Sequence, residues 1–184
     1  MLRGYTTPSA AALDTRTRSA LKHWGMGRYS LPLTPLIHEN LSVLMSFAYS
    51  RKPLMEMMGG FSGEWKYLNK ALFEISEERA EKACLELALF LRMLDDEEKI
   101  SEYHAATHNV PDCGRLIMKD GSEKVLTFRE VANKVIHSSR LEWDFTKQPV
   151  LVCHARPEQT EKWGWVRAEV NVAGLAAVCG QLMS

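Results

Sequence analysis

The spacing of hydrophobic residues changes near the middle of the chain. From residue 34 to residue 99, apolar residues recur every three or four positions, which is the period of helices with one buried face. Thr34 followed by proline predicts the start of a helix that ends at about Ser50, with Pro53 just beyond it. Ser62 is expected to cap the helix that follows.

The longest and most apolar helix is expected to start at Ser76 and to be central. Its buried stripe is formed by Ala80, Ala83, Cys84, Leu87, Leu91 and Leu94. Leu85, Leu89 and Phe90 are expected to widen this buried face. The acidic run at residues 95–98 indicates the exposed end of the helix.

The second half of the chain shows the two-residue period of β-strands. Residues 116–126 predict a β-hairpin, because Asp120 and Gly121 separate two extended runs. Both turn residues are expected to have positive φ. Further strands are predicted over residues 150–155 and 165–172, joined by a turn.

These patterns predict an α+β fold. A helical layer over about 34–99 is expected to accompany a small antiparallel sheet of two β-hairpins in the C-terminal half. Residues 34–184 are long enough for a single domain with one sizeable core. Residues 1–33 are expected to be an irregular basic N-terminal arm, because their arginines and lysines outnumber a single acid, Asp14.

One short helix in the second half carries the clearest hint of chemistry. Thr127 followed three residues later by Glu130 predicts a capping box and therefore a helix start. On this helix Arg129, Asn133 and His137 recur at every fourth position and share one face. A guanidinium, an amide and an imidazole on one face can hold a phosphate and move a proton.

The run Asn-Lys-Val-Ile-His at residues 133–137 resembles a motif of the HEPN superfamily, in which a helix carries an Arg-Asn pair followed by a His. The arginine position of that motif is Ala132 here, and Arg129 is the nearest arginine before it. Many HEPN proteins are metal-independent ribonucleases of defence or toxin–antitoxin systems, and others are binding modules without catalysis. The resemblance implies that His137 is the general acid or base, Arg129 holds the phosphate, and Asn133 orients one of them.

The same helix face also has a structural explanation. A histidine near a helix C-terminus is favoured by the helix dipole, and Arg129 and Asn133 can make hydrogen bonds that only support the fold. The alternative function is therefore a non-enzymatic cytosolic interaction or structural protein, as a homodimer. An open cleft with further basic residues would favour the first function, and a buried, mutually bonded set of side chains would favour the second.

His104 and His108 are four residues apart, a spacing at which two helical histidines can share a metal ion. The sequence fixes no third ligand, and Pro111 indicates that the helix is ending. We therefore expect no metal at this place and a polar loop instead.

Trp163, Trp165 and Arg167 are expected to share one face of a strand. Such a face could stack an unpaired base, as the sheets of some RNA-binding domains do. The alternative is that the tryptophans pack under the central helix or at a dimer contact.

Composition constrains the location and the partners of the protein more than it constrains a reaction. The 23 Lys and Arg residues balance 23 Asp and Glu residues, so any contact with RNA must be local. Four scattered cysteines, the lack of a secretory signal and the lack of a membrane-length apolar run predict a soluble cytoplasmic protein. No phosphate-binding glycine loop is present, so no cofactor is expected. The expected function is an HEPN-like RNA-directed or RNA-binding protein with weak or lost ribonuclease activity, whose partner is RNA or a protein.

Overall fold

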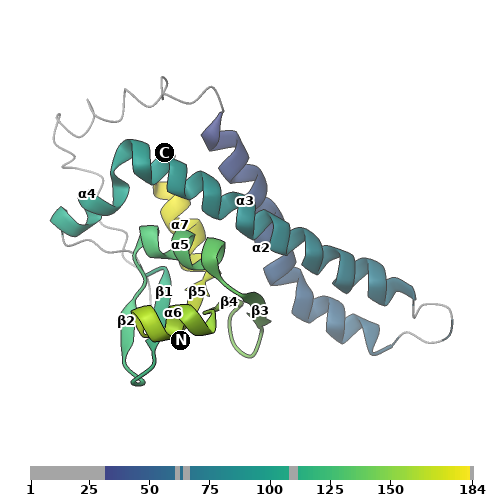
Figure 1. Cartoon of the computed structure of the whole chain (residues 1–184). Helices are drawn as coiled ribbons and strands as arrows, with labels where there is room; N and C mark the ends of the chain where they lie inside the picture. Colours follow the sequence, from purple (N-terminus) through teal and green to yellow (C-terminus); the bar gives the residue numbers. More distant parts are fainter. Residues whose placement is uncertain (1–31, 61–62, 64–66, 108–111, 183–184) are drawn as a thin grey trace, which may run out of the picture. The chain divides into compact units, whose positions relative to one another are not determined.

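The α+β class is confirmed by the structure, a computed structural model that describes residues 32–60, 63, 67–107 and 112–182. These residues belong to one compact unit, Pro32–Ser184, and the predicted N-terminal arm lies outside the described residues except for its last two positions. Figure 1 labels the α-helices and the strands. The elements are α2 (Leu33–Met58), a π-helical segment (Lys70–Glu74), α3 (Ile75–Glu98), α4 (Ile100–Thr107), β1 (Gly114–Met118), β2 (Glu123–Val125), α5 (Phe128–His137), β3 (Arg140–Asp144), β4 (Val150–His154), α6 (Pro157–Trp163), β5 (Trp165–Asn171) and α7 (Val172–Leu182).

The strands form one five-stranded antiparallel sheet in the order β2-β1-β5-β4-β3. The prediction of two separate hairpins is therefore corrected, because β5 pairs with both β1 and β4 and joins the two halves of the sheet. The predicted pairing of β4 with β5 is confirmed, with Cys153 opposite Ala168. The turn predicted between them contains helix α6, and β3 is an additional strand in which Leu141 and Trp143 alternate with exposed polar residues.

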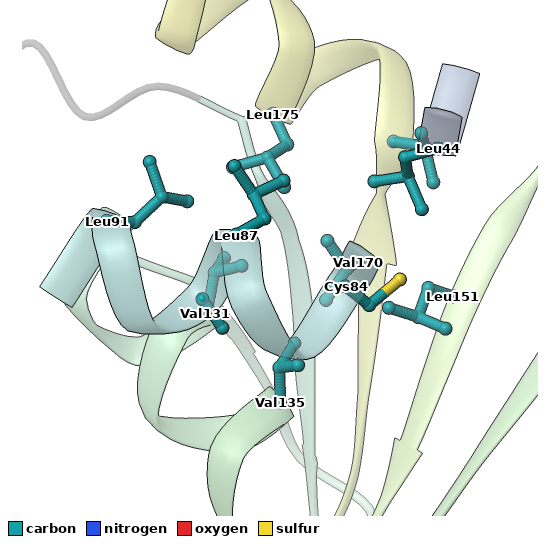
Figure 2. Close-up of a pocket in the computed structure, with 11 residues that line it drawn as sticks. Leu44, Cys84, Leu87, Leu91, Val131, Val135, Leu151, Val170 and Leu175 are labelled. Carbon is teal, nitrogen blue, oxygen red and sulfur yellow. The ribbon is translucent and has the colours of Figure 1, made fainter. Parts of the chain in front are cut away.

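The core is formed where α3, α5 and α7 meet the sheet. Figure 2 shows Leu87 and Cys84 of α3, Val131 of α5 and Val170 of β5 converging, with Leu44 of α2 at the edge of the same cluster. The space left between these side chains is about 10 Å³, no more than a single water molecule needs. The interior is therefore closely packed and offers no room for a ligand.

The buried stripe predicted on α3 is confirmed, but its predicted widening is wrong for two leucines. Leu87 is only 2% exposed, whereas Leu85 is 43% and Leu89 is 50% exposed. They lie on the side of α3 that turns away from the core. Phe90 is half-buried against the core, as the prediction implies.

The predicted end of the first helix at about Ser50 is wrong, whereas the predicted start of α3 at Ser76 differs from the observed one by one residue. Helix α2 continues through Pro53, whose exposed position lets the helix lose one backbone hydrogen bond at the surface. Helix α3 begins at Ile75 as a continuation of the π-helical segment, and the Ser76 hydroxyl donates to the carbonyls of Leu72 and Phe73 rather than capping a helix start. Ser62 lies outside the described residues, and α2 with 26 residues is longer than α3.

The hairpin of β1 and β2 is confirmed, but its turn differs from the expected one. Only Gly121 has a positive φ, of 82°, and Asp120 does not. The Met118 N–H donates to the Ser122 carbonyl at 2.9 Å, which closes a turn of three residues. Asp120 instead accepts hydrogen bonds from the backbone and hydroxyl of Ser122, so its carboxylate stabilises the turn from outside.

The capping box at the start of α5 is confirmed. The Thr127 hydroxyl accepts from the Glu130 N–H at 3.3 Å, and the Glu130 carboxylate accepts from the Thr127 N–H at 2.9 Å. Val131 and Val135 are buried, so the opposite face of α5 is turned away from the core. None of the described helices is long and apolar enough to cross a membrane.

Candidate nucleic-acid interface

The predicted polar face of α5 forms one wall of an open groove. Strands β1, β2 and β5 contribute its floor, and α6 and one residue of α3 complete its sides. The volume of this space, which we call the basic groove, is about 540 Å³. Its lining residues are Arg92, Leu116, Met118, Lys124, Glu130, Asn133, Lys134, His137, Gln159, Trp163 and Trp165.

Local sequence signals hold α6 beside α5. Pro157 stands at the first turn of α6, and Gly164 ends the helix with a φ of 70°, a left-handed conformation that glycine adopts without strain. The Gln159 side chain accepts from the Arg156 N–H and donates to the carbonyl of His137 at 3.0 Å. This bond ties the end of α5 to α6 and leaves the imidazole of His137 exposed at the groove.

The structure brings together two of the three predicted site residues. Asn133 and His137 both line the basic groove. Arg129 does not line it, because its guanidinium pairs with Asp95 at 3.0 Å and with Asp96. The hydrogen bonds that Arg129 donates, the one to Asp96 more than the one to Asp95, raise the pKa of Arg129. Arg129 therefore fits the structural explanation, while Asn133 and His137 fit the open-cleft explanation.

A different arginine supplies the guanidinium in the groove. Arg92 of α3 donates from Nη1 to Oδ1 of Asn133 at 2.6 Å. The two residues are 41 positions apart in the chain, so no local sequence pattern connects them. Sequence reasoning missed Arg92 because the contact depends on how α3 packs against α5 (Figure 1).

The basic groove is rich in hydrogen-bond donors and poor in acceptors. Arg92, Lys124 and Lys134 bring cationic donors, and neither lysine forms a salt bridge with a described residue. The only carboxylate, that of Glu130, already accepts two hydrogen bonds from Thr127. A ligand with several acceptor oxygens and negative charge, such as a phosphate, matches this set of groups.

Lys134 shows the electrostatic character of the groove most clearly. Its ammonium lies 4.2 Å from the ring centroid of Trp165, within the range of a cation–π contact. Burial by the groove walls lowers the pKa of Lys134, against a smaller opposing effect from Glu130. A partly desolvated cation that forms no close ion pair gains free energy when an anion binds beside it.

The predicted shared face of Trp163, Trp165 and Arg167 is wrong. Trp163 belongs to α6, and a β-bulge at Val166 rotates Trp165 toward the helices, where it is 2% exposed. Arg167 is on the opposite face of the sheet and pairs with Glu169 at 2.7 Å. The predicted packing role is right for Trp165, whereas Trp163 is 56% exposed and lines the basic groove.

The opposite face of the sheet has balanced charges. It carries three exposed pairs of opposite charge, Arg115–Glu123, Arg140–Glu142 and Arg167–Glu169. Because each of these cations already has an acidic partner, this face attracts an anion less than the basic groove does.

The other chemically interesting residues do not form a site. The four cysteines are buried as free thiols, and burial raises the pKa of Cys113, Cys153 and Cys179 to about 12 and that of Cys84 further. Such thiols are not nucleophiles at neutral pH. His108 lies outside the described residues, and no group of three metal-ligating side chains occurs in the part of the chain that the structure describes.

Comparison with known proteins finds no family model, no curated protein and no solved structure that matches this chain. The HEPN resemblance of residues 133–137 therefore stays a prediction. The geometry of the basic groove is the main guide to function.

Proposed function

We propose that the basic groove binds single-stranded RNA. The observation that carries the proposal is the meeting of three cations, Arg92, Lys124 and Lys134, with an exposed tryptophan, Trp163, in one open groove. Phosphates would interact with the cations, and an unpaired base would stack on the indole. The predicted residue Asn133 lines the same groove and accepts a hydrogen bond from Arg92.

The volume of the groove suits a short stretch of a single strand. About 540 Å³ is in the range of pockets that hold small organic ligands, and the groove is open rather than closed. A double helix would present its bases to one another and leave none to stack on Trp163. Single-stranded RNA therefore fits the combination of charge and exposed aromatic surface better than duplex RNA does.

His137 gives the groove a group that can move a proton. In the proposed reaction His137 takes the proton of a ribose 2′-hydroxyl, and the 2′-oxygen forms a bond to phosphorus. The bond from phosphorus to the 5′-oxygen breaks, and that oxygen takes a proton from water. The hydroxide left behind takes the proton held on His137, which returns the imidazole to its neutral form. The products are a 2′,3′-cyclic phosphate and a 5′-hydroxyl, and no metal ion takes part.

The binding test compares a fluorescein-labelled oligouridylate with inorganic polyphosphate. Wild-type protein should bind both, and Trp163→Ala should weaken RNA binding by about 5- to 100-fold, the loss of one stacked base. Polyphosphate has no base, so its binding should not change. Tyr49→Ala is the matched control, because Tyr49 is an exposed aromatic residue of α2 that does not line the groove. Lack of RNA binding by the wild type would refute the proposal.

The cleavage test uses the same RNA in the presence of EDTA. His137→Ala should abolish any release of 2′,3′-cyclic phosphate ends and should leave the urea midpoint nearly unchanged, because His137 is exposed. Cleavage that persists in His137→Ala would exclude the catalytic role. If the wild type binds RNA without cutting it, the protein is a binding module and the proposed RNA binding stands.

A further inference from the structure

We infer that Arg92, rather than Arg129, is the arginine that binds phosphate in the basic groove, and that Asn133 is its positioning residue. This inference rests on the RNA-binding function proposed above and names the group that recognises the RNA backbone. It departs from the sequence pattern, in which Arg129 shares a helix face with Asn133 and His137.

The charge of Arg129 is paired with two carboxylates outside the basic groove. Its guanidinium bonds with Asp95, which is 5% exposed, and with Asp96. Asp95 also accepts a hydrogen bond from the Ser101 N–H at 2.7 Å, at the start of α4. Releasing Arg129 toward a phosphate would leave a buried carboxylate without its cation, which is costly. Arg129 thus links α3, α4 and α5 and supports the fold.

Arg92 has donors to spare. One N–H of Nη1 donates to Asn133 at 2.6 Å, and Nε is 4.0 Å from the Asp96 carboxylate, which is too far for a hydrogen bond. A guanidinium has five N–H groups, and the others in Arg92 form no hydrogen bond with a described residue. Two of these donors can bind a phosphate as a fork.

Asn133 fixes the direction of that fork. Because arginine can only donate, the atom of Asn133 that faces Arg92 must be the carbonyl oxygen Oδ1. The amide nitrogen of Asn133 then remains a donor at the groove. Asn133 therefore holds Arg92 in place and adds a neutral donor for the same phosphate or for its base.

The experiment measures how the affinity for the labelled oligouridylate depends on NaCl concentration. The slope of log K against log salt reports the number of phosphates that the protein neutralises, with about 0.7 per phosphate on a single strand. Arg92→Ala should weaken binding and reduce the slope by about 0.7. Arg92→Lys should restore the slope, because the charge returns, but should stay several-fold weaker, because the fork is lost.

Asn133→Ala separates positioning from charge. It should weaken binding several-fold and leave the slope at the wild-type value, since Arg92 keeps its charge. A merely structural role of Asn133 would not produce this combination of lower affinity and unchanged slope. Urea melts of each variant confirm that the comparison is made on folded protein, and Arg92→Lys provides the test if Arg92→Ala does not fold.

Arg129→Ala is the decisive comparison, and Arg140→Ala, on the opposite face of the sheet, is the control for diffuse charge. Both should keep the wild-type slope. A reduced slope in Arg129→Ala with an unchanged slope in Arg92→Ala overturns the inference while RNA binding stands. Equal reductions in all three variants also overturn it, because the charge effect is then diffuse. If the wild type does not bind the RNA, the proposed function and the inference fail together.

Discussion

Replacing Leu87 by alanine tests the position of the core, and Leu89 offers a closely matched comparison. Both leucines lie on α3, so the chemistry of the change and its effect on helix propensity are the same. They differ in burial, since Leu87 is 2% exposed and Leu89 is 50% exposed. The difference between the two variants therefore isolates the free energy of burying one side chain.

The expected cost for Leu87→Ala follows from its surroundings. Removing three carbons that are almost wholly buried costs about 2.4 kcal/mol, at ~0.8 kcal/mol for each. The void adds about 1–2 kcal/mol at ~24 cal/mol per Å³, because the neighbours of Leu87 already pack with little free space. The total is about 3.5–4.5 kcal/mol. For Leu89→Ala the transfer cost is about half as large and water fills the vacated space, so we expect about 1 kcal/mol or less.

Urea unfolding followed by tryptophan fluorescence and by circular dichroism gives both free energies, provided the two probes agree. A difference of less than about 1 kcal/mol between the variants would refute the assigned position of the core. A large cost for Leu89→Ala that grows with protein concentration would instead show that Leu89 is buried between two copies of the chain, as the homodimer alternative requires.

Three further predictions concern the capping box of α5, the four thiols and the stability of the fold at acid pH. Thr127→Ala should lower the free energy of unfolding by about 1 kcal/mol, because the capping hydrogen bond is lost. In the same urea melts Thr127→Ser, which keeps the hydroxyl, should be close to wild type. Equal losses in the two variants would exclude the hydroxyl as the cause. The four buried cysteines should not react with a thiol reagent at pH 8 in native protein, and denatured protein prepared without reductant should give four free thiols; a denatured count of two or none would reveal disulfides. Arg129 holds the pKa of Asp96 below its usual value, so their ion pair stabilises the fold above about pH 4 and is lost as the pH falls through that lowered pKa. Urea midpoints should therefore fall less steeply with acid in Asp96→Asn than in wild type, and parallel curves would contradict this.

Local signals in the sequence were sufficient for several parts of the fold. The capping box at Thr127 needs only residues three positions apart, and the stripe around Leu87 needs only the helical period. Both could be predicted because the groups that interact are neighbours in the chain. The general division into a helical first half and a β-rich second half follows for the same reason.

The parts that could not be predicted depend on distant partners. The β-bulge at Val166 lies in the pairing of β5 with β1, and it puts Trp165 and Arg167 on opposite faces of the sheet. Arg92 reaches Asn133 only after α3 has packed on α5. The candidate site was therefore half predictable: Asn133 and His137 follow from the helical period, whereas the cations from other elements do not.

The central place of β5 has a consequence for the order of folding. Each hairpin, β1 with β2 and β3 with β4, can form from residues close in sequence. In contrast, Ile117 of β1 pairs with Arg167 of β5, which lies far along the chain. Closing so long a loop is slow, and until it closes β1 and β5 each present an unpaired edge. During synthesis on the ribosome, the floor and walls of the basic groove would come together only after β5 has emerged. A nascent chain is therefore expected to acquire its ligand late and to depend on rapid docking of β5 to avoid aggregation.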